Sequence, residues 1–219
     1  MNQFLQRLRK EEFVPKKVLD IGAEKGSWTL SALQVFDSSH YTLVEPIEYT
    51  ELNKFKTYHT DKFEVIHTIL NDYDGQVDWY EMRNTGDSIN KERTYHFNDC
   101  LPVKKECKQL DSLYEHETFD LIKIDVQGAE LNVLEGGKKM IQNTSFIILE
   151  MPFMGQYNTN TPNFLTHIQK MDQLGFVPYD IVDQHRCDDT LLFQLDMCFI
   201  NKTHSLNNKI QTKIDNMGK

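Results

Sequence analysis

The sequence has few cysteines, and none of them forms a recognisable pair. Its four cysteines show no CxxC spacing, which argues against a zinc ribbon in a chain of 219 residues. A disulfide framework is also disfavoured, because disulfide-dense domains are usually much shorter. The cysteines are Cys100, Cys107, Cys187 and Cys198. A reducing cytoplasmic setting is therefore expected.

Basic charge and long apolar runs are also scarce. There are 33 acidic residues against 24 Lys and Arg, for a formal charge of -9, whereas phosphate-backbone binding depends on basic surface. No apolar stretch approaches the length of a membrane span. The first 13 residues mix charge with Phe4, Leu5 and Leu8, which indicates an amphipathic helix and not a signal peptide. We therefore predict neither a nucleic-acid nor a membrane partner.

Length and composition favour one domain. A chain of 219 residues with 39% hydrophobic content can bury one substantial core. We expect a single domain over residues 1–200, with an N-terminal helix within residues 1–15. Residues 201–219 are polar and poor in aromatics, which predicts a loosely held tail. Nothing in the sequence indicates the oligomeric state.

Short apolar runs alternate with helical patterns along most of the chain. This order is typical of an α/β protein with a parallel sheet and helices on both faces. The runs that predict strands are residues 18–21, 41–44, 63–66, 119–124 and 146–149.

Two regions depart from this alternation. Residues 76–105 are polar and predict a strand near residues 77–80 followed by a long loop, which in a compact domain is often functional. Near the end of the chain, "GFVPYDIV" and "LLFQLDMCFI" are two β-rich runs joined by polar residues. They predict an antiparallel hairpin that closes the sheet.

A glycine turn follows the first predicted strand in "VLDIGAEKGSWTL". Gly22 and Gly26 precede a helix, where a backbone without side chains can approach a ligand closely. Glu24 stands where a dinucleotide-binding turn has its second glycine, and its carboxylate would repel a pyrophosphate. The turn therefore disfavours a nicotinamide dinucleotide, although an oxidoreductase of the same fold is an alternative.

Glu45 ends the second predicted strand in "TLVEP". An acid at that place can accept hydrogen bonds from both ribose hydroxyls of an adenosine. A ribose-binding acid beside a turn unsuited to phosphates indicates S-adenosylmethionine, whose cationic amino group would be attracted by Asp20 and Glu24.

The stretch "FDLIKIDVQGAELNVLEGG" is the second informative motif. It places Asp125 at the tip of a strand, and in a doubly wound sheet ligands bind beyond the carboxyl ends of the strands. Glu130 follows in the first turn of the next helix, where an acid suits the helix dipole.

These motifs resemble the FkbM-type class I methyltransferases, which use S-adenosylmethionine. "VLDIGAEKGSWT", "LVEP", "DSL" at residues 111–113, "LIKIDVQGAELNVLEGG", "ILEMP" and "GF" at residues 175–176 occur in the family's order, over residues 16–201. The resemblance implies a Rossmann-like fold with a seven-stranded, mostly parallel sheet. It further implies that Asn71 and Asp72 flank the adenine and that Asp125 lies under the reactive end of the cofactor. The predicted cofactor-binding residues are Asp20, Gly22, Ala23, Glu24, Gly26, Glu45, Asn71, Asp72 and Asp125.

The resemblance suggests O-methylation, for which the acceptor hydroxyl must lose its proton to a base or to a metal-assisted step. The candidate catalytic residues at strand ends are Asp125, Glu150 and His185. Mg²⁺ is a possible addition, but no ligand spacing such as HExxH is present. We therefore predict no required metal.

Two segments are candidates for binding the acceptor, which we expect to be a sugar, another small molecule or a glycan hydroxyl. The loop at residues 82–105 contributes Asp87 and Ser88, and the loop at residues 152–162 contributes Tyr157 and Asn158. A non-catalytic scaffold that kept the fold is the alternative from a different class of protein. A nucleic-acid methyltransferase is disfavoured, because "DVQG" replaces the Pro-Pro-Tyr type of motif.

Overall fold

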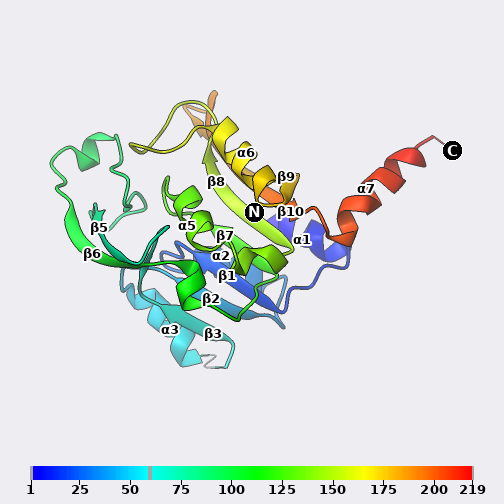
Figure 1. Cartoon of the computed structure of the whole chain (residues 1–219), viewed down its shortest axis with the longest axis horizontal. Coiled ribbons are helices and arrows are strands. Elements are labelled where there is room, and N and C mark those ends of the chain that lie inside the picture. The colour runs from blue at the N-terminus through cyan, green and yellow to red at the C-terminus, as the bar shows by residue number, and fades with distance from the viewer. Residues whose placement is uncertain (1, 59–60, 219) are drawn as a thin grey trace.

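Seven strands form the central sheet of the protein, seen in a computed structural model that describes residues 2–58 and 61–218 (Figure 1). Six of the strands run parallel, and β10 runs antiparallel to both of its neighbours. In spatial order they are β3 (Phe63–Ile66), β2 (His40–Val44), β1 (Lys17–Ile21), β7 (Leu121–Ile124), β8 (Phe146–Pro152), β10 (Leu191–Asn201) and β9 (Phe176–Cys187). The predicted parallel sheet and the antiparallel hairpin at its edge are both confirmed.

Alternating side chains of the strands supply two cores, one on each face of the sheet. Val18 of β1 belongs to the first core and Leu19 to the second, as the two-residue period of a strand requires. The first face is covered by α1 (Asn2–Lys10), α2 (Ser27–Leu33) and α3 (Thr50–Tyr58). The second is covered by α4 (Leu110–Leu113), α5 (Glu130–Gly136), the 3₁₀ turn η2 (Met140–Asn143) and α6 (Phe164–Gln173).

A small second sheet lies beside the carboxyl ends of the parallel strands (Figure 1). It consists of β4 (Ile69–Leu70), β6 (Val103–Lys108) and β5 (Gly75–Trp79). The predicted strand near residues 77–80 corresponds to β5. Its partner β6 was not predicted, because the sequence "VKKECK" is mostly exposed and shows only Cys107 buried.

The segment between β5 and β6 is mostly irregular, with a short 3₁₀ turn η1 (Tyr95–Phe97). Two of its polar side chains attach it to the turn after β7. The Ser88 hydroxyl lies 2.9 Å from the Val126 carbonyl and 3.0 Å from the Gln127 carbonyl. The Asn90 amide donates to the Gly128 carbonyl at 2.8 Å. The long loop is therefore held over the carboxyl edge of the main sheet.

The end of the chain corrects a sequence expectation. Where a loosely held tail was predicted, α7 (Ser205–Asp215) forms and packs against the first core through Leu206. Lys209 and Lys213 both pair with Glu11, at 2.8 and 2.7 Å. The prediction missed this helix because its contacts are made to residues near the other end of the chain. Within residues 2–58 and 61–218, no helix has the length and apolar character needed to span a bilayer.

Candidate active site

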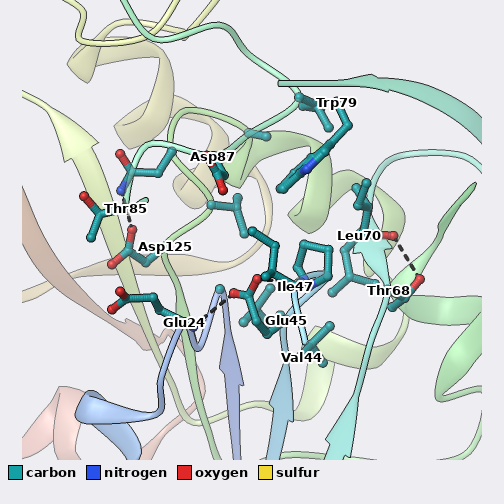
Figure 2. A pocket seen from close by; sticks show the side chains of 18 of the residues that line it. Glu24, Val44, Glu45, Ile47, Thr68, Leu70, Trp79, Thr85, Asp87 and Asp125 are labelled. Carbon is teal, nitrogen blue, oxygen red and sulfur yellow. Dashed lines mark hydrogen bonds between the residues drawn. The ribbon is translucent and has the colours of Figure 1, made fainter. Parts of the chain in front are cut away.

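A cleft opens at the carboxyl ends of β1, β2 and β7 and is bounded on its far side by the small sheet. Figure 2 shows two distinct ends: the labelled acids Glu24 and Asp125 lie at one, and Trp79 and Leu70 lie at the other. Glu45 lies between them. The cleft is thus acidic at one end and apolar at the other.

Gly22 brings the first turn close to the end of β7. It has a left-handed backbone with φ of 76°, and a β-carbon there would lie 1.8 Å from the Asp125 carbonyl oxygen. Any other residue would push β1 and β7 apart. The glycine is therefore required for the close approach that forms the floor of the cleft.

Glu45 is buried at the end of β2 and is held by two backbone amides. One carboxylate oxygen accepts from the Glu24 amide at 3.0 Å, and the other accepts from the Ile47 amide at 2.9 Å. Burial raises the pKa of Glu45 to about 7, against these hydrogen bonds. Each oxygen keeps a further lone pair, so the carboxylate can accept two hydroxyls from a ligand.

Besides Glu45, three acids line the cleft: Glu24, Asp87 and Asp125. Asp87 accepts from the Met82 amide at 2.7 Å through one oxygen. Its other oxygen is buried and has no hydrogen-bond partner among the described residues. A buried carboxylate oxygen without a donor is costly, and a cationic ligand group would supply one.

The apolar end is lined by Ile47, Ile69, Leu70 and Trp79. Trp79 is 5% exposed, and its indole nitrogen donates to Glu81 at 3.2 Å. This fixes the ring as a wall of the cleft, with a shape and polarity suited to a planar base.

Several predicted cofactor residues support the cleft from outside its lining. Asp20 is fully buried and accepts from the Thr29 hydroxyl at 2.6 Å, which ties α2 to β1. Ala23 donates its amide to Val44. Gly26 has φ of 81° at the start of α2, and a β-carbon there would meet the Phe55 ring at 2.4 Å.

Asn71 and Asp72 also lie outside the lining of the cleft, so their predicted place beside the adenine stays a prediction. Asn71 is 2% exposed and accepts from the Asn132 amide at 3.0 Å. Its carbonyl lies 2.1 Å from where a β-carbon on Gly136 would be. The chain passes so close to α5 here that these residues pack on the helix, and residues 68–70 of the preceding segment line the cleft instead.

Asp125 connects the cleft to a second group of polar side chains. The Gln127 amide nitrogen lies 2.8 Å from an oxygen of Asp125 and 2.8 Å from an oxygen of Glu150. Lys123, buried in the sheet, pairs with Asp125 at 2.8 Å. Burial and the charge of Asp125 together raise the pKa of Glu150 well above its usual range, whereas Lys123 holds the pKa of Asp125 low despite burial.

His185 lies on β9 beside Asp196 of β10. The imidazole Nε2 is 3.9 Å from an Asp196 oxygen, and Asp196 raises the pKa of His185. Ligand atoms of Glu150, His185 and Asp196 all lie within 4.8 Å of one another. The three predicted catalytic residues are therefore brought into one region, with Asp196 as an addition.

The predicted acceptor residues divide between structural and cavity-lining positions. Ser88 is fully buried and holds the loop as described above. Asn158 is also buried, and its amide donates to the Asn90 carbonyl at 3.0 Å. Tyr157 and Asn158 line a small cavity beside Glu150.

Four residues of this region escaped the sequence analysis: Trp79, Lys123, Gln127 and Asp196. Lys123 and Asp196 carry a detectable signal, because each is a single charge inside a strand that is otherwise mostly apolar. A buried charge of this kind needs a partner. Trp79 gave no such signal, because it reaches the cleft only through the pairing of β5 with the unpredicted β6.

The donor set fits S-adenosylmethionine. Glu45 offers a carboxylate for the ribose hydroxyls, and the apolar end offers a wall for adenine. Asp87 and Asp125 offer negative charge for the amino and sulfonium groups. Pyrophosphate does not fit, since the carboxylate of Glu24 lines the cleft beside the turn and would repel it.

A seven-stranded sheet of this order with such a cleft defines a class I methyltransferase fold. The family model for the methyltransferase FkbM domain matches residues 20–178. The chain therefore belongs to the FkbM methyltransferase family and uses S-adenosylmethionine.

Related proteins agree with this assignment. The chain is 26% identical over 163 residues to the 2-O-methyltransferase NoeI of Sinorhizobium fredii, covering 66% of this chain and 67% of NoeI. The crystal structure of the methyltransferase FkbM from Methylobacillus flagellatus is 14% identical with a TM-score of 0.52, over 83% of this chain and 43% of that one. This chain thus spans less than half of that protein.

A 1,6-didemethyltoxoflavin-N1-methyltransferase from Burkholderia thailandensis, solved with S-adenosylhomocysteine bound, shares the fold. It is 12% identical with a TM-score of 0.53, over 90% of this chain and 76% of that one.

Proposed function

We propose that this protein transfers a methyl group from S-adenosylmethionine to a hydroxyl group of a small-molecule or glycan acceptor. The observation that carries the proposal is the continuity of polar groups from the cofactor cleft to the far rim. Gln127 bridges Asp125, at the acidic end of the cleft, and Glu150, at the end of β8. The similarity to a protein named as a 2-O-methyltransferase supports oxygen as the accepting atom.

The chemistry requires positioning and removal of a proton. When bound, the cofactor supplies an electrophilic methyl group on its sulfonium. An acceptor hydroxyl must lie in line with that methyl group and lose its proton as the new bond forms. The candidates for accepting this proton are Asp125, Glu150 and His185, which lie around the same rim of the sheet.

The loops over this rim exclude water and shape the acceptor site. The segment between β5 and β6 meets the loop after β8 through a bridge between Glu92 and Asn158. The two loops thus form one cover, to which Tyr157 and Asp87 contribute side chains. Excluding water strengthens the electrostatic interactions beneath such a cover.

Isothermal titration with S-adenosylhomocysteine, with NADH in parallel, tests the cofactor assignment. We expect saturable binding of the first alone, with severe loss in the Glu45→Ala variant. Transfer of a labelled methyl group from S-adenosylmethionine to a panel of sugars, glycans and small alcohols then tests the acceptor class. Cofactor binding without transfer to any hydroxyl compound, but with transfer to amines, would overturn the O-methylation proposal.

A further inference from the structure

Three strands of the main sheet bring Glu150, His185 and Asp196 together at its carboxyl edge. Glu150 lies on β8, His185 on β9 and Asp196 on β10. Their ligand atoms lie within 4.8 Å of one another. We propose that this group, here called the β8–β10 triad, binds one divalent transition-metal cation such as Mn²⁺.

The register of the sheet places two acids of the triad opposite each other. Asp196 lies directly opposite Glu150 in the antiparallel pair of β10 and β8. Two carboxylates in this relation repel each other. The nearest buried cation is Lys123, and its hydrogen bond goes to Asp125. With one lysine facing Asp20, Asp125 and Asp196, the region holds an excess of negative charge.

The burial of the Asp196 carboxylate is a second observation that favours a bound cation. Its side chain is only 7% exposed, and an Asp196 oxygen lies 3.9 Å from Nε2 of His185. A carboxylate buried this deeply needs compensating positive charge beside it. An ion held by the triad would supply that charge, because the ligand atoms of its three residues lie within 4.8 Å of one another.

The size and donor types of the triad suit a transition metal. Neighbouring ligands at about 2.2 Å from one ion lie about 3–4 Å apart, so the side chains must close by about 1–2 Å at most, a shift that side-chain rotation can supply. Imidazole with carboxylates favours Mn²⁺ or Zn²⁺ over Ca²⁺, which prefers oxygen ligands alone. The His185 side chain is 42% exposed, which leaves an entry path from solvent.

The small cavity that Glu150 lines has room for about one water molecule. Glu130 and Thr161 each leave a buried oxygen without a partner among the described residues, and both line the small cavity beside Glu150. Buried polar oxygens around a cavity are typical of bound water. A cation at the triad would lower the pKa of a bound acceptor hydroxyl. That role rests on the proposed function, whereas the binding of the ion does not.

Titration of the full chain with Mn²⁺ alone tests the site. We expect one ion per chain, with affinity reduced at least tenfold in Asp196→Asn and in His185→Gln. The matched control is Asp188→Asn at the exposed tip of the β9–β10 hairpin, which should bind Mn²⁺ like the unchanged protein. Pulsed electron paramagnetic resonance should show coupling of Mn²⁺ to an imidazole nitrogen, and this coupling should vanish in His185→Gln.

S-adenosylhomocysteine binding on the same samples separates the two hypotheses. It reports folding of each variant and tests the cofactor site independently. Absence of one-to-one Mn²⁺ binding in a protein that binds S-adenosylhomocysteine would overturn the triad proposal alone. Equal affinity in Asp196→Asn and Asp188→Asn would overturn it as well. Metal binding without S-adenosylhomocysteine binding would instead overturn the proposed function.

Discussion

At the scale of single residues, Glu45 makes cofactor affinity depend on pH. Its pKa in the free protein is raised to about 7 by burial, whereas ribose hydroxyls donate to the ionised form. Protons must therefore leave Glu45 when the cofactor binds below pH 7. We expect the affinity for S-adenosylhomocysteine to rise about tenfold between pH 6 and pH 8.

Isothermal titration across this range checks the prediction. Glu45→Gln should bind more weakly and lose the Glu45 contribution to the pH dependence. Glu48→Gln, an exposed acid three residues away, is the matched control and should keep the rise. A rise of the same size in Glu45→Gln would show that another group is responsible.

Trp79 is the residue that most defines the apolar end of the cleft. Its ring is buried and fixed by a hydrogen bond to Glu81. Loss of an aromatic contact to a base costs about 1–3 kcal/mol, so we expect Trp79→Ala to weaken S-adenosylhomocysteine binding about tenfold or more. Trp79→Phe should keep most of the affinity. Melting curves of both variants show whether the small sheet still folds, and unchanged binding in a folded Trp79→Ala would contradict this role.

At the scale of elements, two side chains of the segment between β5 and β6 attach it to the turn after β7. Ser88 and Asn90 bond to three successive carbonyls after β7. We expect the double variant Ser88→Ala, Asn90→Ala to exchange amide hydrogens faster over residues 80–102 and to lose catalytic rate, because the cover opens to water.

Hydrogen exchange by mass spectrometry measures this effect. Asn98→Ala lies in the same segment on an exposed residue and serves as the control. The strands of the main sheet should keep their protection in both proteins. Faster exchange throughout the sheet would mean that the hydrogen bonds of Ser88 and Asn90 stabilise the whole fold and not the cover alone.

At the scale of the whole molecule, Glu45 reduces the stability of the unliganded fold. An acid whose folded pKa is raised from 4.5 to about 7 favours the folded state at low pH, and this contribution is lost as the pH rises towards 7. The loss amounts to roughly 3 kcal/mol at most. The free energy of unfolding of Glu45→Gln, relative to the unchanged protein, should therefore increase by up to that amount between pH 4.5 and pH 8.

Chemical denaturation of both proteins at the two pH values measures the difference. The comparison cancels the contributions of the other titrating groups to the free energy of unfolding. One of these groups is Glu11, whose pKa is lowered by two lysines. A constant difference across the range would show that Glu45 has the same pKa in the folded and the unfolded protein.

The sheet was predictable because its buried strands are short apolar runs, and the glycine turn and Glu45 could be placed because they follow such runs directly. The triad could not be placed, since its members come from three strands. The local sequence does not determine the register in which these strands pair. β6 and α7 were missed for a related reason. Their sequences are largely polar, and each forms through pairing with distant segments.

The segment between β5 and β6 contributes to both sides of the site. Trp79, at the end of β5 just before the segment, and Asp87, within it, line the cofactor cleft, while Glu92 further along bridges to Asn158 beside the acceptor cavity. Binding of the cofactor would thus order this segment, and with it the cover over the acceptor site, before an acceptor binds. We expect a compulsory order of addition, with the cofactor first and its demethylated product leaving last. Product-inhibition kinetics would then show S-adenosylhomocysteine competing with S-adenosylmethionine and not with the acceptor.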